Sequence, residues 1–477
     1  MIAVCGCGAP TPLGSTAAST EAVEWRYLVR LDDAMRTSDV RICFVGPRAR
    51  PAFLRPAVRD AAPALLTAER VSDSGERHVL EIKDGDVQLG GMSDDECVLL
   101  RVDMKRAMGT FRPVALERGS SWLVSTAYWF WAPSAPTHVD RARIAFEAPE
   151  SMHVVPPFRA VEGPQGTVTY EAGADLFDFM GQIAVVPRAP IAFRTPDVDV
   201  RIATMDGELA VGPDEIRAWI GKAVSAVRSV GGRFPADRLT VIVVPVPVAK
   251  EPVVFGNVVR GGGPTITLYV STHATAEELH ANWVAVHELS HLLHPFTPEP
   301  CLAEGLATYY QEVLLARMGA QSEEAAWRAL DEGFARGRAD GTGLRLEDES
   351  RDMHDTHAYR RVYWSGAALA LRMDVALRRS ASSVHSLDGL LAEFRARNDA
   401  MRTWPARELL GAWDRLAGER LLEPMCDSWL VTEAFPETDD LYAYLGIERN
   451  RKGALVFDDN APGAGVRHAI MAPLAAP

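Results

Sequence analysis

The chain has 477 residues, of which 47% are hydrophobic and 24% charged, a balance that is ordinary for a globular protein with room for roughly two to four domains. Its formal net charge is -14. This charge argues against a nucleic-acid partner, because phosphate backbones are bound by concentrated basic surfaces. Beyond the first residues, no stretch reaches the roughly 18 apolar residues that a membrane-spanning helix needs.

The N-terminal residues, Met1 to Gly8, resemble the end of a bacterial lipoprotein signal, with small residues before a cysteine and a Pro/Ser/Thr-rich stretch after it. The basic region and most of the apolar region of such a signal are missing. We therefore expect residues 1–21 to be either a signal remnant or a disordered terminus. The first alternative implies the cell envelope or periplasm, with a possible lipid anchor, and the second implies the cytoplasm.

The six cysteines are scattered along the chain and form no C-x-x-C pair, which predicts neither a zinc knuckle nor a disulfide framework and leaves the redox compartment open. They are Cys5, Cys7, Cys43, Cys97, Cys301 and Cys426.

Residues 22–190 contain short alternating runs of apolar and polar residues broken by Gly and Pro, a pattern typical of antiparallel β-structure. The runs are 41–45, 98–104, 121–131, 142–148 and 167–170. The most aromatic piece, Tyr128 to Pro133, is interpreted as a sheet strand in preference to a wall of a substrate cleft.

From residue 193 onward, strands and helices are mixed. We expect a strand over 193–201, a helix over 213–230 and a buried strand over 239–246. Two further apolar runs, 253–259 and 265–270, flank three consecutive glycines and predict a hairpin or a strand entered by a flexible loop.

The sequence His287-Glu288-Leu289-Ser290-His291 carries the clearest chemical signal. Two histidines four residues apart lie on one face of a helix, and H-E-x-x-H is the pattern of two zinc ligands and a general base. Thr275 and Glu278 form a capping box ahead of it. We therefore predict one helix over 274–294.

A tetrahedral catalytic zinc needs a third protein ligand and one position open to water. Glu304, near the start of a second helix that we expect to reach about Met318, follows a proline-containing loop that can turn the chain back. The competing ligand is His294, on the same face as His291, but Pro295 breaks the helix beside it. His280 also shares that face, and we expect it to line the cleft or to lie in the core.

These motifs resemble the gluzincin metallopeptidases, in which H-E-x-x-H is joined by a glutamate from a following helix. The nearest likeness is to the glycyl aminopeptidase family, with aminopeptidase N and thermolysin more distant. The resemblance implies one Zn²⁺ held by His287, His291 and Glu304, with Glu288 as general base.

The resemblance also implies an α+β fold in which an N-terminal all-β domain, 22–190, precedes a thermolysin-like catalytic domain with an edge strand and a zinc helix, 191–380. A helical C-terminal region, 381–450, and a tail, 451–477, follow.

Two further roles follow from the same resemblance. Tyr363 matches a tyrosine that donates to the oxyanion of the tetrahedral intermediate, with Tyr359 in reserve. The stretch from Gly263 to Val270 corresponds to the edge strand on which peptide substrate lies, so Gly263, Thr265 and Thr267 become candidate substrate contacts. Aminopeptidase N relatives carry G-x-M-E-N there, and this chain offers no matching carboxylate, which leaves specificity for a free amino terminus open.

Beyond Met318 we expect a helix over 323–336 and an acidic loop over 337–356, with His354 and His357 exposed to solvent. The segment 359–366 then runs into a helix over 367–379. Residues 387–444 read as helical, followed by a short strand over 454–457 and a Pro/Gly-rich tail.

The sequence therefore predicts a zinc-dependent hydrolase, most simply a peptidase with a peptide or protein substrate. Two other classes stay open. One is a zinc hydrolase of esters, amides or epoxides on the same scaffold, and the other is a zinc-binding envelope protein without turnover. Nothing in the sequence indicates an oligomeric state.

Overall fold

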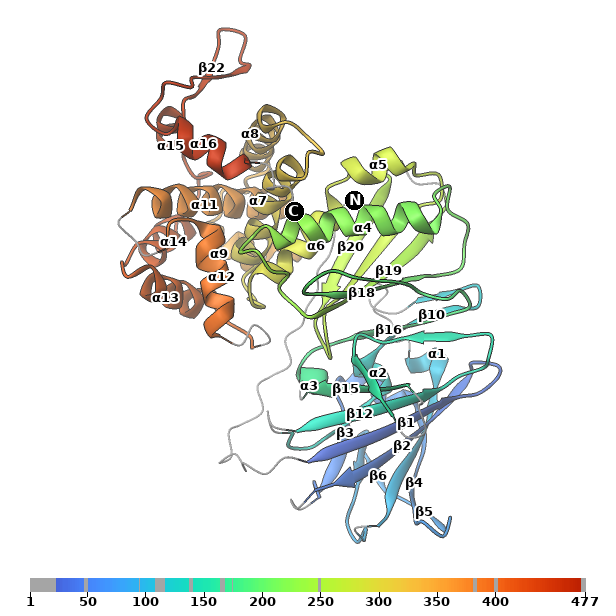
Figure 1. Ribbon diagram of the computed structural model, residues 1–477. Coiled ribbons are helices and arrows are strands. Elements are labelled where there is room, and N and C mark those ends of the chain that lie inside the picture. The colour runs from blue at the N-terminus through green and yellow to red at the C-terminus, as the bar shows by residue number, and fades with distance from the viewer. Residues whose placement is uncertain are drawn as a thin grey trace.

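The computed structural model describes residues 23–46, 50–93, 95–107, 116–136, 140–163, 168–173, 175–247, 250–380, 384–398 and 402–472. A domain of β-sheets is followed along the chain by a five-stranded sheet with helices and then by a region of helices (Figure 1). The predicted α+β fold with an N-terminal β domain and a C-terminal helical region is confirmed.

The largest N-terminal sheet has eight strands and forms because inward side chains alternate with outward ones. In its central strand the residues Trp25, Tyr27, Val29 and Leu31 are buried. Its pairs are antiparallel as predicted, except that the first strand pairs in parallel with residues 141–147. In spatial order the strands are β14 (Arg159–Glu162), β15 (Val168–Gly173), β12 (Arg141–Glu147), β1 (Glu24–Leu31), β2 (Thr37–Val45), β8 (Cys97–Asp103), β4 (Leu65–Val71) and β5 (Arg77–Val79).

Two four-stranded sheets and some short helices complete this domain. One sheet is β13 (His153–Val155), β16 (Gln182–Val186), β10 (Ser121–Ser125) and β9 (Leu116–Arg118), and the other is β11 (Trp131–Pro133), β3 (Phe53–Pro56), β7 (Asp86–Gln88) and β6 (Ile82–Lys83). The short helices are η1 (Arg59–Ala64), α1 (Met104–Ala107), α2 (Thr126–Trp129) and α3 (Asp175–Asp178).

The aromatic stretch Tyr128 to Pro133 is not a single strand, so that interpretation was wrong. Its first half belongs to α2 and its second half to β11. The Ser125 hydroxyl accepts a hydrogen bond from the Ala127 amide and so caps a helical turn in mid-run. The aromatic side chains are buried in the core of the β domain.

Cys43 and Cys97 form a disulfide, which the sequence analysis did not predict. The two cysteines are 54 residues apart, but β2 and β8 are neighbouring antiparallel strands whose last registered pair is Ile42 with Val98. The next pair in that register brings the two sulfurs together. Cys301 and Cys426 are free and buried.

The second domain is built on the strands β17 (Ile191–Arg194), β18 (Asp199–Thr204), β19 (Arg238–Val246), β21 (Thr265–Ser271) and β20 (Val253–Val259), in that spatial order. The helices α4 (Pro213–Arg228) and α6 (Val284–Ser290) belong to the hydrophobic core on one face of this sheet. The other face packs on the sheet β13-β16-β10-β9 of the N-terminal domain, where Ile242 and Val244 meet Leu123, Ala184 and Val186. Figure 1 shows β16 and β10 lying beneath β18 and β19.

Two strand predictions in this domain need correction. The expected strand over 193–201 is the antiparallel pair β17 and β18, because the Thr195 amide donates to the Val198 carbonyl and closes a turn between them. The predicted hairpin is confirmed, but its edge strand is β20, since β21 is paired on both sides, with β19 and β20. A substrate added to this edge would meet β20 and not β21.

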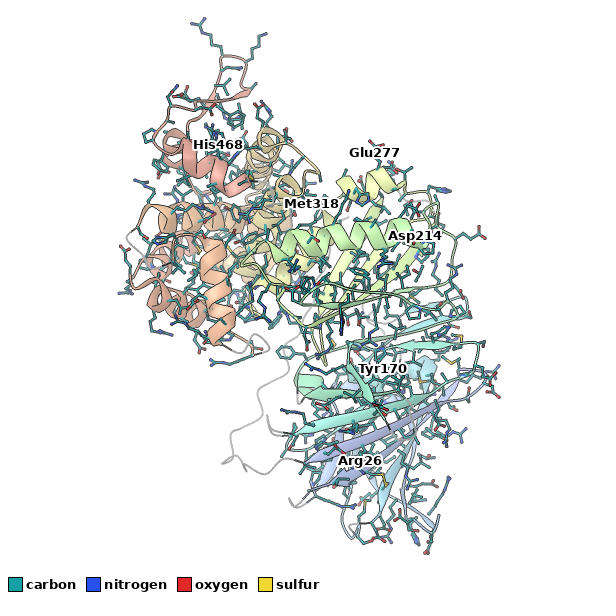
Figure 2. The ribbon with its side chains drawn as sticks, viewed as in Figure 1. Arg26, Tyr170, Asp214, Glu277, Met318 and His468 are labelled. Carbon is teal, nitrogen blue, oxygen red and sulfur yellow. A yellow bond between two sulfur atoms is a disulfide. The ribbon has the colours of Figure 1, made fainter. Side chains whose placement is uncertain are left out.

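The expected helix over 274–294 is divided. Its capping box starts a separate short helix, α5 (Ala276–Ala281), and Asn282 then adopts an extended conformation and accepts the Val284 amide on its side chain. The zinc-motif helix is therefore α6, and it tightens into the 3-10 turn η3 (His291–Leu293) at its second histidine. Glu277 on α5 and Asp214 on α4 lie at the side of the molecule away from the N-terminal domain (Figure 2).

The last region consists mainly of helices, as predicted, with α7 and α11 as its central pair. They are α7 (Pro300–Arg317), α8 (Glu323–Ala339), α9 (Leu346–Arg351), α10 (Met353–Thr356), α11 (Tyr359–Arg379), α12 (Leu387–Arg397), α13 (Ala406–Ala417), α14 (Leu422–Leu430), α15 (Asp439–Leu445) and α16 (Ala464–Met471), with the hairpin strands β22 (Ile447–Arg449) and β23 (Leu455–Phe457). Within the described residues, no helix is long and apolar enough to cross a membrane.

The expected loop over 337–356 contains α9 and α10, which are held by a buried ion pair between Glu349 and Arg361, 3.0 Å apart. The expected tail contains α16. Its Arg467 is buried and donates to the Leu445 and Gly446 carbonyls, and His468 pairs with Glu323 at the start of α8 (Figure 2). These polar contacts are long-range and leave no periodic signal in the sequence.

Candidate metal centre and active site

Three side chains from α6, η3 and α7 converge on one point. The ligating atoms of His287, His291 and Glu304 all lie within 4.8 Å of one another. The Glu304 carboxylate is 3.3 Å from the Nε2 atom of His287 and 3.5 Å from that of His291. All three residues are more than nine-tenths buried. The structure therefore brings together the three residues that the sequence singled out as ligands.

The electrostatics of this cluster are those of a buried anion between two bases. Burial alone would raise the pKa of Glu304, but the neighbouring imidazoles hold it far below its usual range. Burial alone would lower the pKa of His287, but the hydrogen bond to Glu304 and the charges of Glu288 and Glu304 raise it. Each partner thus stabilises the other's charged form.

The donor set fits a divalent transition metal. Two imidazoles and a carboxylate are a known ligand set of catalytic zinc, which takes three protein ligands and keeps one position open. The Nε2 atom of His291 is buried and has no hydrogen-bond partner among the described residues. A buried ring nitrogen without a partner is costly for a protein, and a bound cation removes that cost.

Glu288 lies beside this cluster and is 3% exposed. Burial raises the pKa of its carboxyl above the usual range, and its Oε2 atom is buried without a hydrogen-bond partner among the described groups. The edge strand β20 passes directly over it. A Cβ atom on Gly256 would lie 2.6 Å from Glu288 Cγ and 2.9 Å from Oε1, so glycine makes this close approach possible.

Tyr363 lies on α11, one turn into the helix and not at its entrance as expected. Its ring is half-buried and stacks on that of His287, with centroids 6.3 Å apart and planes at 13°. The helices α7, which carries Glu304, and α11, which carries Tyr363, cross where Gly305 faces Gly366. A Cβ atom on either glycine would clash with the backbone of the other segment, so these glycines allow the two helices to approach closely. Tyr359, the reserve candidate, is instead hydrogen-bonded through its hydroxyl to His354, 3.3 Å away.

The remaining histidines lie outside the cluster. His294 is buried with its Nδ1 atom 2.8 Å from the Pro295 carbonyl, and burial lowers its pKa to about 3. His280 is on the separate helix α5, and desolvation with the nearby Lys222 charge lowers its pKa. His357 is exposed, as expected, whereas His354 is half-buried.

The candidate substrate contacts on β21 were chosen on the wrong strand. Thr265 and Thr267 are completely buried, and Thr267 donates to the Gln182 side chain of β16. Gly263 lies in the buried turn that leads into β21. None of the three lies on the sheet edge, because β20 covers their strand.

Sequence reasoning missed two residues near the cluster. Gly256 carries no chemical signal, since only the fold places it over Glu288. The Oε1 atom of Gln311 accepts a hydrogen bond from His287 Nδ1 over 2.9 Å. It follows Glu304 by seven residues, two helical turns, so helical spacing could have identified it. Thr308, one helical turn beyond Glu304, is buried with a hydroxyl that has no partner among the described groups.

No protein-family model and no curated protein matches this sequence. Solved structures do resemble it. An aminopeptidase N family protein from Idiomarina loihiensis has a TM-score of 0.66 at 14% identity, over 92% of this chain and 82% of that one. The M1 zinc metallopeptidase of Deinococcus radiodurans gives 0.53 at 14% identity, over 87% and 94%, and yeast LTA4 hydrolase gives 0.50 at 12%, over 87% and 68%.

This chain has the fold of the M1 zinc metallopeptidases. Identities this low show the fold and do not carry an activity across. The predicted gluzincin-type architecture is thereby confirmed at the level of fold, and the closer likeness to glycyl aminopeptidases remains a prediction. The same order of N-terminal sheets, five-stranded sheet and helical region along the chain belongs to this fold.

Proposed function

We propose that the protein is a zinc-dependent peptidase whose metal is held by His287, His291 and Glu304. The observation that carries this proposal is the convergence of these ligating atoms within 4.8 Å beside the buried Glu288. When bound, a zinc ion lowers the pKa of its water, so that hydroxide able to attack a carbonyl is present at neutral pH. A binding protein without turnover would have no use for a buried carboxyl at the position of Glu288.

Glu288 acts as the proton carrier. Its carboxylate takes the proton of the attacking water while the new C–O bond forms, and it returns that proton to the nitrogen as the C–N bond breaks. The raised pKa of this buried carboxyl helps it to hold the proton between the two steps. Tyr363 donates from its phenol to the developing oxyanion, and its stacking on His287 supports this position.

The substrate binds as an added strand on β20, the edge strand of the five-stranded sheet that lies against Glu288, where main-chain hydrogen bonds recognise any extended peptide. Residues 253–264, which span β20 and its glycine turn, carry no acidic side chain and one arginine, Arg260. This stretch therefore offers no countercharge for a free ammonium group. We infer that cleavage does not depend on a free amino terminus.

Peptides with and without a free amino terminus distinguish an aminopeptidase from an endopeptidase. A peptide that the protein cleaves is offered with a free and with an acetylated amino terminus. We expect comparable kcat/KM values for the two forms. Loss of cleavage of the acetylated form would establish an aminopeptidase mode and would leave the zinc chemistry unaffected.

The Cys43–Cys97 disulfide bears on the compartment, because disulfides persist in oxidising environments. We propose that the protein functions in the cell envelope or periplasm. The N-terminal residues that suggested a lipoprotein signal lie outside the described residues. Labelling of free thiols in protein isolated under alkylating conditions tests the proposal, since reduced Cys43 and Cys97 would contradict it.

The central experiment separates zinc binding from hydrolysis. The purified protein digests a peptide library with and without chelator, and products are read by mass spectrometry. We expect chelator-sensitive cleavage, and we expect Glu288→Gln to keep stoichiometric zinc but lose cleavage. Turnover by Glu288→Gln would remove the general-base role. Stoichiometric zinc with no peptide cleavage would favour a hydrolase of other acyl compounds or a binding protein.

A further inference from the structure

A chain of buried amide and carboxyl groups runs outward from the first histidine of the zinc motif. The Nδ1 atom of His287 lies 2.9 Å from Gln311 Oε1. Gln311 Nε2 donates to Glu312 Oε1 over 2.8 Å, and Gln321 Nε2 donates to Glu312 Oε2 over 3.0 Å. Gln311 and Glu312 belong to α7, and Gln321 lies in the connection to α8.

The chain fixes which way the Gln311 amide points. A carboxylate can only accept hydrogen bonds, so Glu312 requires the amide nitrogen of Gln311 on its side. The amide oxygen of Gln311 must then face His287, and an oxygen there requires a proton on Nδ1. The lone pair of His287 is thereby placed on Nε2, the atom that faces Glu304.

Glu312 is suited to orient Gln311 because its carboxylate is buried and accepts two side-chain hydrogen bonds. It is 7% exposed, and burial raises its pKa, while the hydrogen bonds from Gln311 and Gln321 oppose that rise. Gln321 also donates to the Glu312 main-chain carbonyl over 3.1 Å and so holds the far end of the chain. Among the described residues, Gln311 is the group that hydrogen-bonds to the Nδ1 atom of His287.

We propose that Gln311, oriented by Glu312 and Gln321, is a positioning residue that holds His287 in the tautomer able to bind zinc and so sets the zinc affinity of the site. The proposal rests on the zinc site of the proposed function. It concerns residues beyond the ligands, and hydrogen-bond partners of metal-binding histidines typically contribute about 10- to 100-fold in affinity.

The test compares three variants of the full chain. Gln311→Ala removes the acceptor. The double variant Gln311→Glu with Glu312→Gln exchanges the two groups but keeps every hydrogen bond, because the new amide donates to the new carboxylate and accepts from Gln321. Tyr310→Phe is the control, since it removes a buried hydrogen bond to Asp388 from the same helix without contacting His287.

Two quantities are measured for each variant: the zinc dissociation constant by chelator competition, and the melting temperature of the zinc-free protein. We expect Gln311→Ala to weaken zinc binding about 10- to 100-fold and the exchanged variant to bind at least as tightly as the wild type. Tyr310→Phe should lower the melting temperature and leave zinc affinity unchanged.

Wild-type affinity in folded Gln311→Ala would overturn the proposal. If Gln311→Ala does not fold, the zinc affinity of the exchanged variant tests the proposal instead. Zinc binding weakened about tenfold or more in that variant would overturn the orienting role, because all its hydrogen bonds are retained. A wild-type protein that binds no zinc would instead refute the proposed function, so the two failures can be told apart.

Discussion

Replacing Gly256 by alanine should reduce turnover without removing the metal. The added Cβ would lie 2.6 Å from Glu288 Cγ and 2.9 Å from Val284 Cγ1, whereas carbon atoms normally approach to about 3.5–4.0 Å. Relief requires a displacement of about 1 Å, taken up by Glu288 or by β20. A misplacement of about 1 Å costs about 100-fold in rate, or about 2.7 kcal/mol of barrier.

The assay measures kcat on a peptide that the wild type cleaves, together with zinc content and the melting temperature. The control is Gly221→Ala on α4, where an added Cβ meets no atom within 4 Å and alanine favours the helix. We expect zinc content to stay stoichiometric in Gly256→Ala, because the nearest atoms belong to Glu288 and Val284 and not to a ligand. Folded, zinc-loaded Gly256→Ala with kcat within about threefold of the wild type would refute the placement of Glu288 against the edge strand.

Three further outcomes follow from the site. Tyr363→Phe should lower kcat about 100-fold or more, the cost of one oxyanion donor, with unchanged zinc affinity, and an unchanged kcat would exclude that role. Glu304→Ala should weaken zinc binding, measured by chelator competition, by more than the roughly 100-fold typical of outer partners, and a smaller loss would remove it from the ligand set. His294 has a pKa of about 3 in the folded protein against 6.5 when unfolded, so it takes up a proton on unfolding as pH falls below 6.5. Its replacement by Phe should make the zinc-free protein lose about 2 kcal/mol less stability between pH 7.5 and pH 5, measured by denaturant unfolding, and equal losses would contradict a buried neutral His294.

The proposed ligands could be identified in the sequence because they lie close together along the chain. His287 and His291 are four residues apart, on α6 and on the 3-10 turn that continues it, so spacing selected this pair. Glu304 follows at the start of the next helix, and the resemblance to gluzincins favoured it over His294. The hairpin of β20 and β21 was also predictable, since two apolar runs flank a glycine turn.

What could not be predicted depends on contacts between distant segments. The order of β21 and β20 in the sheet is decided by which strand pairs with β19, and both read as apolar runs. Asn282 interrupts the expected long helix, and its side chain accepts a hydrogen bond from the amide of Val284, the first residue of α6. Asparagine side chains compete in this way with the hydrogen bonds of a continuous helix. The Cys43–Cys97 pair and the close approach of Gly256 to Glu288 likewise arise only once strands have paired.

The junction of the two β-sheets at Leu123, Ala184, Ile242 and Val244 determines how the protein can be dissected. A fragment that begins near residue 191 would keep all the proposed ligands, but it would present one bare face of the catalytic sheet to water. Exposed apolar surface of that kind promotes self-association. The N-terminal domain therefore covers the second face of the five-stranded sheet, and we expect the smallest stable fragment that carries the proposed site to include it.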